Sequence, residues 1–336
     1  MISRRHILAA SAGAMLALAA GLPAFAQEVK EINFGILSTE SQATARPAWA
    51  PFLADMEKFT GIKVHPFFGN DYAAVIEGMR FNKVQVAWYG NASVIQAVDR
   101  SSAEIFVQST YMTGGDGYYS VLIVHKDSPL KSLEDVVNSP NGKLTFGNGD
   151  PNSTSGFLIP SYYAWARNNI DITKHFGRVL PGNHESNMLA VSSKQVDVAT
   201  GNTEDLERFE KNQPERFKNI RVIWKSPLIP SDPIAWRSDL PAEAKNKIKA
   251  FFLDYGHPTA GKSEAEVKRQ VAVLRELQWG LFKPSSNKQL LPIREVALFR
   301  DKLKVQNDAS LSDQDKQAKL REIDDKLIEL KKQAGA

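Results

Sequence analysis

Three consecutive hydroxyl residues, Ser153, Thr154 and Ser155, stand where a strand pattern gives way to a helix pattern. The strand is expected over 144–147 and the helix over 153–168. The first turn of a helix has free N–H groups, and the helix dipole adds positive potential there, so such turns bind anions. A single hydroxyl would be an ordinary N-cap, and that interpretation stays open. Three in a row, with glycines beside them that let a ligand approach the backbone, favour an anion-binding site.

A histidine and two acids occupy comparable positions further along the chain. His184 begins an expected helix, Glu204 lies in the first turn of another, and Asp232 lies in a proline-rich turn. Each alone has an ordinary explanation as a cap, a dipole-complementing acid or a turn residue. Two carboxylates would repel a simple phosphate, because like charges near one site cost free energy. Together with an anion pocket they are typical of a site for a zwitterion, which carries an anionic head and an ammonium group.

The same residue types also permit a nucleophilic enzyme. Ser153 or Ser155 could be the nucleophile, with His184 as the base and Glu204 as the group that orients it. The chain lacks the Gly-x-Ser-x-Gly turn that commonly presents such a serine, which weighs against this alternative. The six histidines do not occur at metal-ligand spacing, so we expect neither a zinc site nor another cofactor.

The first 26 residues have the pattern of an export signal. Arg4 and Arg5 precede an apolar stretch over 7–22, and Ala24-Phe25-Ala26 is a small-x-small cleavage site. The order Ser-Arg-Arg-x-x-Leu resembles a twin-arginine signal, while an ordinary secretory signal with two chance arginines stays open. The sequence therefore predicts export to the periplasm.

Composition indicates a soluble, two-domain α/β protein. The 336 residues exceed one ordinary core, and the absence of cysteine excludes disulfides and thiolate chemistry. Basic residues are interspersed with acids, which argues against a nucleic-acid partner. Beyond the leader, no apolar run approaches the length of a transmembrane helix.

Strand and helix patterns alternate in two blocks, which predicts two mostly parallel sheets covered by helices. Thr39 and Gln42 have the spacing of a capping box before a helix that ends near Gly61. Extended segments near 118–128 and 222–236 join the blocks, so the chain crosses twice and these crossings could form a hinge. Ligands in such folds bind between the lobes.

The domain boundaries follow from these crossings. We expect an export signal, a first lobe in two pieces, a second lobe and a helical extension, over residues 1–26, 27–123 with 230–300, 124–229, and 301–336. In the extension, Ser312 and Asp315 form a capping-box pattern, and Leu320, Ile323, Leu327 and Leu330 follow at coiled-coil spacing. This short stripe is equally consistent with packing on its own chain and with a homodimer.

The chain resembles the periplasmic phosphonate-binding proteins of phosphonate ABC transporters, the PhnD family. The resemblance covers essentially the whole chain after the leader and is carried by long, specific stretches, at 33–36 with 38–42, 78–84, 87–91, 145–157 and 224–230. It implies a two-lobed type II periplasmic-binding-protein fold that closes on 2-aminoethylphosphonate and similar alkylphosphonates. It also implies delivery of the ligand to a membrane permease, and some members of such families dimerise through C-terminal helices.

Carried over residue by residue, the resemblance assigns a ligand-binding role to eight side chains. Ser153, Thr154 and Ser155 would hold the phosphonate oxygens, and Glu204 and Asp232 would receive the ammonium group. The remaining donors would be Tyr72, Tyr118 and His184, although either tyrosine could be a plain packing residue. The same fold with phosphite, phosphate or methylphosphonate as ligand remains an alternative, which the two carboxylates disfavour.

Overall fold

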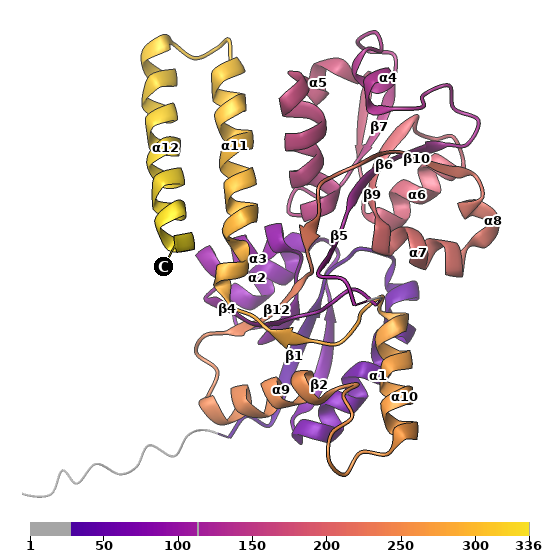
Figure 1. Ribbon diagram of the computed structural model, residues 1–336, viewed down its shortest axis with the longest axis vertical. Helices are drawn as coiled ribbons and strands as arrows, with labels where there is room; N and C mark the ends of the chain where they lie inside the picture. Colours follow the sequence, from indigo (N-terminus) through magenta and orange to yellow (C-terminus); the bar gives the residue numbers. More distant parts are fainter. Residues whose placement is uncertain (1–27, 113, 336) are drawn as a thin grey trace, which may run out of the picture.

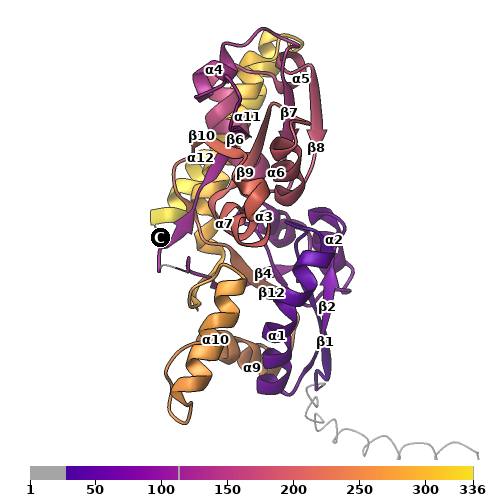
Figure 2. The ribbon, with the colours of Figure 1, turned by 90° about the vertical axis from the view of Figure 1, so that its right-hand side faces the viewer.

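Two β-sheets, one in each lobe, form the frame of the molecule in the computed structural model, which describes residues 28–112 and 114–335. The expected leader lies outside the described residues. Figure 1 shows the lobes one above the other, with a pair of helices alongside them, and Figure 2 shows the same arrangement from the side. The fold is therefore the two-lobed α/β architecture with C-terminal helices that the sequence predicts.

The first lobe contains a mixed six-stranded sheet in which β1 pairs in parallel with β2 and β3, whereas β12 and β13 run antiparallel to their neighbours. Its strands in spatial order are β13 (Lys283–Pro284), β4 (Ala103–Gln108), β12 (Pro233–Arg237), β3 (Val86–Trp88), β1 (Glu31–Ile36) and β2 (Lys63–Phe68). Its helices are α1 (Gln42–Thr60), α2 (Tyr72–Arg80), α3 (Asn91–Arg100), α9 (Ala242–Asp254), α10 (Glu264–Glu276) and the 3-10 turn η4 (Asn287–Leu290).

Helix α1 shows how the sequence builds this lobe. Its apolar stripe, which includes Trp49 and Phe52, is buried against the sheet and packs with Phe252 of α9 in one aromatic core. The helix ends at Gly61, whose φ of +69° is the left-handed conformation that favours glycine. The expected capping box at Thr39 is wrong, because Ser41 caps the helix by accepting a hydrogen bond from the Thr44 N–H.

The second lobe contains a five-stranded sheet with a helical layer on each face. Its strands in spatial order are β10 (Ile220–Lys225), β6 (Ser120–His125), β9 (Val198–Asn202), β7 (Thr145–Asn148) and β8 (Arg178–Pro181). Its helical segments are α4 (Leu133–Val137), η1 (Thr154–Leu158), η2 (Ser161–Trp165), η3 (Ala166–Asn168), α5 (Ile172–His175), α6 (His184–Ser192), α7 (Thr203–Asn212) and α8 (Pro214–Phe217). Two separate apolar clusters fill its faces.

The two crossings between the lobes pair with each other. Strand β5 (Gly117–Tyr118) runs antiparallel to β11 (Ile229–Pro230), apart from both larger sheets. A side chain at Gly117 could not fit, since a Cβ there would lie 2.0 Å from the Ile229 carbonyl oxygen. The sequence predicts one extended segment near 118–128, whereas the structure interrupts it at Tyr119, where the chain leaves the crossing for the second sheet.

The last two helices, α11 (Leu291–Asn307) and α12 (Asp313–Gly335), form an antiparallel pair beside both lobes (Figure 1). Ile323, Leu327 and Leu330 of the predicted stripe are buried, and α12 packs on α11 of the same chain. This pairing accounts for the stripe within one chain, so the pattern gives no support to a homodimer. The lobe boundaries stay a prediction; β6 belongs to the second sheet, and α11 runs across residue 300.

None of the helices in the described part of the chain combines the length and hydropathy needed to cross a bilayer.

Candidate functional site

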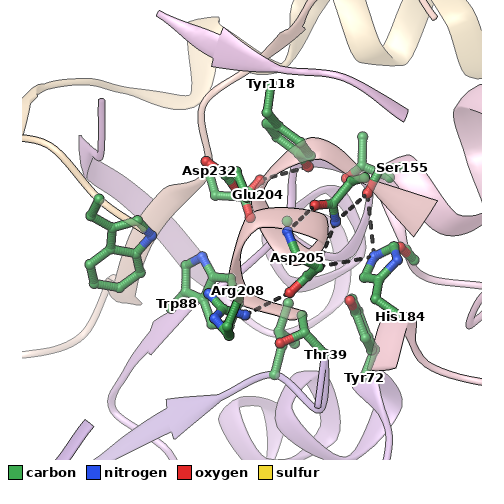
Figure 3. A pocket seen from close by; sticks show the side chains of 16 residues that line it. Thr39, Tyr72, Trp88, Tyr118, Ser155, His184, Glu204, Asp205, Arg208 and Asp232 are labelled. Carbon is green, nitrogen blue, oxygen red and sulfur yellow. Dashed lines mark hydrogen bonds and ion pairs between the residues drawn. The ribbon is translucent and has the colours of Figure 1, made fainter. Parts of the chain in front are cut away.

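One cavity between the lobes brings together every candidate residue (Figure 3). The sequence-predicted residues that line it are Tyr72, Tyr118, Ser153, Thr154, Ser155, His184, Glu204 and Asp232. They come from the first lobe, the second lobe and the crossing strand β5. Their contacts with a ligand remain a prediction, but their convergence from positions 160 residues apart is a property of the fold.

The hydroxyl cluster, which consists of Ser153, Thr154 and Ser155, is buried at the start of η1. Ser153 is the N-cap, and its Oγ accepts from the Gly156 N–H at 3.0 Å. Thr154 Oγ1 reaches across the cleft and accepts from the Ala92 N–H, at 2.8 Å, in the first turn of α3. A hydroxyl that accepts a hydrogen bond keeps its own proton to donate. The cluster is therefore both a helix cap and a set of neutral donors.

The helix behind this cluster begins with wider turns than predicted. The Leu158 N–H bonds to the Ser153 carbonyl at 3.0 Å, which is the spacing of a π-helix rather than of an α-helix. Two carbonyls of the first turn bond outside the helix instead, since Ser155 accepts from the Ser120 hydroxyl and Gly156 from the Gly149 N–H. These outside bonds tie the turn to the second sheet and hold the cluster at the cavity.

His184 lies against the hydroxyl cluster as a neutral side chain. Its Nε2 is 3.4 Å from Ser155 Oγ, and burial lowers the pKa of the imidazole. Its Nδ1 is buried without a hydrogen-bond partner among the described residues. A catalytic triad needs a carboxylate at that second nitrogen, and neither ring nitrogen is bonded to Glu204. The structure does not assemble the Ser-His-Glu triad that the sequence left open.

The acidic pair, Glu204 and Asp232, lies with Tyr118 at another side of the cavity (Figure 3). The Tyr118 hydroxyl donates to Asp232 Oδ1 at 3.0 Å. Burial raises the pKa of Asp232 to about 7, and burial together with the charge of Asp232 raises the pKa of Glu204 well above its usual range. Both carboxylates would hold their charge more easily beside a cation. Burial also raises the pKa of Tyr72 and Tyr118, so both phenols stay protonated.

Sequence reasoning missed several residues of the wall. These are mainly Thr39, Trp88, Asn202, Asp205 and Arg208. The sequence places Glu204 in the first turn of a helix but assigns no role to Asn202 or Asp205 of the same segment. Asn202 Nδ2 donates both to Ser155 Oγ, at 3.3 Å, and to Asp205 Oδ2, at 2.6 Å. Within the described residues no group of His, Cys, Asp and Glu side chains has the arrangement of a metal site.

Comparisons with known proteins give a consistent result. A family model described as "ABC transporter, phosphonate, periplasmic substrate-binding protein" matches residues 34–290. The phosphonates-binding periplasmic protein of Escherichia coli (strain K12) is 51% identical over 309 residues, which cover 92% of this chain and 88% of that protein. The phosphate-import protein PhnD of Mycolicibacterium smegmatis is 25% identical over 262 residues, which cover 74% of this chain and 80% of that protein.

A solved structure extends the comparison to the fold. The crystal structure of a binding protein component of an ABC phosphonate transporter from Pseudomonas aeruginosa matches with a TM-score of 0.86 and 50% sequence identity. The match covers 92% of this chain and 99% of that chain. The likeness therefore extends over both lobes.

Proposed function

The chain belongs to the family of periplasmic substrate-binding proteins of phosphonate ABC transporters, and from this premise we propose that its ligand is 2-aminoethylphosphonate. It is a phosphonate-binding periplasmic component of such a transporter, and the relatives named above are transport proteins rather than enzymes. The proposed ligand is a zwitterion with a phosphonate at one end and an ammonium group at the other.

The observation that carries this proposal is the difference between the two sides of the cavity. The hydroxyl cluster, Tyr72 and His184 offer neutral donors, which suit phosphonate oxygens without adding a counter-charge. Asp232 is buried and Glu204 is half-buried, both carboxylates have raised pKa values, and an ammonium group would supply a cation beside them. We assign Tyr118 to the acidic side, because its hydroxyl already bonds to Asp232.

A second candidate is an oxyanion without an ammonium group, namely phosphate, phosphite or methylphosphonate. The phosphate-import relative supports this alternative, since a protein of related sequence carries that name. The hydroxyl cluster would accept such a ligand equally well. The acidic pair disfavours it, because a ligand without a cation would leave both carboxylates uncompensated and close to an added negative charge.

Delivery and export complete the proposal. Closure of the lobes around β5 and β11 would present the loaded form to a membrane permease. The leader pattern at 1–26, with Arg4 and Arg5, supports export through the twin-arginine route.

Calorimetric titration with 2-aminoethylphosphonate and with ethylphosphonate tests the ligand assignment. The two ligands share the phosphonate head, but only the first carries an ammonium group. We expect strong binding of the aminated ligand and much weaker binding of ethylphosphonate. Equal affinities would retain the oxyanion pocket and reject the ammonium site. Competition with phosphate at equal concentration distinguishes the two candidates. The second candidate predicts that phosphate displaces 2-aminoethylphosphonate, and the first predicts that it does not.

A further inference from the structure

One face of helix α7 touches the opposite lobe at every turn. Glu204 of this helix lines the cavity, and Glu207, Arg208 and Lys211 follow at helical spacing. Glu207 accepts a hydrogen bond from Tyr111, and Lys211 Nζ is 2.5 Å from Glu276 Oε2 in α10. The helix that carries an acidic ligand residue is therefore also the helix that the second lobe uses to hold the first.

Arg208 occupies the centre of this face. Its side chain is only 13% exposed, and its Nη1 is 2.6 Å from Asp205 Oδ1 in the same helix. The same nitrogen is 3.7 Å from Glu40 Oε2 of the first lobe, and Nη2 donates to the Leu277 carbonyl, also in the first lobe, at 3.4 Å. A planar guanidinium can serve several acceptors at fixed angles, which a lysine ammonium cannot do from one position.

Behind Arg208 the contacts continue to the hydroxyl cluster. Asp205 accepts from Asn202 Nδ2, and the same amide donates to Ser155 Oγ. Asp205 Oδ2 also lies 3.9 Å from His184 Nε2. An unbroken path of polar contacts thus runs from Glu40 of the first lobe, through Arg208 and Asp205, to the donors expected to hold an oxyanion (Figure 3 shows most of this path).

The charge of the cavity makes this arginine unusual. Three carboxylates line the cavity, namely Glu204, Asp205 and Asp232, and a fourth, Glu40, lies beside Arg208. Arg208 is the one lysine or arginine among the 16 residues drawn around the cavity in Figure 3. A buried carboxylate that loses its partner is strongly unfavourable. When the lobes come together, Glu40 loses water, and the guanidinium is the cation placed to compensate it.

A second contact beside Glu40 shows that this part of the first lobe is held from both sides. Glu185, in the first turn of α6, accepts from the Ser41 N–H at 2.7 Å and from the Thr44 hydroxyl at 3.1 Å. The Glu185 N–H in turn donates to the Thr39 carbonyl at 3.2 Å. The second lobe therefore also holds the N-terminal end of α1, in the same segment as Glu40.

We propose that Arg208 is a positioning residue for ligand capture, which joins the closed lobes through Glu40 and Leu277 while it holds Asp205 behind the hydroxyl cluster. The inference rests on the proposed function insofar as closure traps the ligand. The hydrogen bonds and ion pairs of Arg208 go to Asp205, Glu40 and Leu277 and not to the hydroxyl cluster or the acidic pair, so we expect Arg208 to act on every ligand of the cluster. Removing it lowers affinity without a change in preference between aminated and plain phosphonates.

Four variants test this proposal: Arg208→Gln, Arg208→Lys, Glu40→Gln, and Arg208→Gln combined with Glu40→Gln. Each is titrated calorimetrically with 2-aminoethylphosphonate, ethylphosphonate and inorganic phosphate. Small-angle X-ray scattering with and without saturating ligand measures closure. Arg216→Gln is the matched control, because Arg216 is an exposed arginine of the same lobe in α8. Thermal unfolding of each ligand-free variant separates loss of folding from loss of closure.

We expect Arg208→Gln to weaken each ligand that the wild-type protein binds by a similar factor, on the order of tenfold or more. Arg208→Lys should recover part of this loss, and Glu40→Gln should weaken binding by less than Arg208→Gln. The double variant should bind no more weakly than Arg208→Gln alone, because both changes remove one shared contact. The ligand-induced compaction should shrink in Arg208→Gln and stay at the wild-type value in Arg216→Gln.

Several outcomes overturn the proposal. Affinities of Arg208→Gln within twofold of wild type would do so. A loss of affinity confined to the aminated ligand would do so as well, and so would additive effects of Arg208→Gln and Glu40→Gln on affinity. If Arg208→Gln does not fold, an unchanged affinity in Glu40→Gln still rejects the cross-lobe role. Wild-type binding of phosphate but not of 2-aminoethylphosphonate rejects the proposed ligand, and the phosphate titrations then decide the role of Arg208. Wild-type binding of none of the three ligands rejects both.

Discussion

The hydroxyl cluster and the acidic pair line the same cavity but are built in opposite ways. Ser153, Thr154 and Ser155 are consecutive residues, and the hydroxyl of each accepts a hydrogen bond from another residue of the chain. Glu204 and Asp232 come from different segments, and burial and mutual repulsion oppose their ionisation. The hydroxyls on one side of the cavity are hydrogen-bonded within the chain, whereas the carboxylates on the other side would be stabilised by a cation.

This difference separates affinity from selectivity. A set of neutral donors that is already held in place costs little to reorganise, so it can contribute to the binding of any tetrahedral oxyanion. On the proposed function, the acidic pair should favour ligands that bring a positive charge and oppose those that do not. We therefore expect the hydroxyl cluster to set how tightly oxyanions bind and the acidic pair to set which of them binds best.

Removing the charges of the acidic pair should have the largest effect. In Glu204→Gln with Asp232→Asn, we expect the affinity for 2-aminoethylphosphonate to fall roughly 100- to 1,000-fold, because the ammonium group loses two charged partners. The affinity for ethylphosphonate should stay unchanged or rise, since repulsion of the phosphonate is removed. Calorimetric titration of both ligands measures the change. Glu210→Gln, an exposed acid of the same helix α7, is the control. Unchanged binding of the aminated ligand would show that the acidic pair does not receive an ammonium group.

Removing one hydroxyl should have a smaller and less selective effect. In Ser155→Ala, we expect both ligands to bind roughly 10- to 100-fold more weakly, because a hydrogen bond to a charged oxygen is lost at a site that Asn202 and His184 hold in place. The ratio of the two affinities should stay the same. Titrations of the two ligands, with the exposed Ser193→Ala as control, measure that ratio. A loss restricted to the aminated ligand would contradict the division of roles between the two sides.

The two sides also differ in how far the sequence predicts them. The hydroxyl cluster is readable because its three residues are adjacent and follow a strand, although the wider π-helical turns behind it depend on the outside bonds of Ser155 and Gly156. The acidic pair has a weaker signal in the sequence. It is predicted because two carboxylates beside an anion pocket suit a zwitterion, and because the family resemblance assigns both residues to the ligand. Arg208 and Glu185 have no local signal, because charged residues on a helix surface are usually solvated and their partners lie in the other lobe.

The fold shows the same limit. The alternation of strands and helices follows from local periodicity and the end of α1 from Gly61, and the structure confirms both. The break at Tyr119 cannot be predicted from local periodicity, because it depends on the pairing of β5 with β11, which is more than 100 residues away in the sequence. The apolar stripe of α12 was correctly identified as a packing face, but the periodicity alone left open whether its partner was α11 or a second chain.

A change of pH should produce the smallest effect, and its sign distinguishes the two sides. Burial raises the pKa of Asp232 to about 7 and raises that of Glu204 well above its usual range, so without ligand part of this pair is protonated below neutral pH. An ammonium group favours the ionised form and lowers both pKa values in the complex. Binding therefore releases protons, and the affinity for 2-aminoethylphosphonate should rise about tenfold between about pH 5.5 and 7.5.

Ethylphosphonate isolates this effect, because it shares the titrating phosphonate and lacks the ammonium group. Its affinity should stay level or fall over the same range, since ionisation of the acidic pair repels it. Calorimetry in two buffers of different ionisation enthalpy counts the protons released directly. Parallel pH profiles for the two ligands would show that the phosphonate alone titrates, and would remove the electrostatic contrast between the acidic pair and the hydroxyl cluster. In Glu204→Gln with Asp232→Asn the two profiles should become parallel, because the only groups that distinguish the ligands no longer ionise.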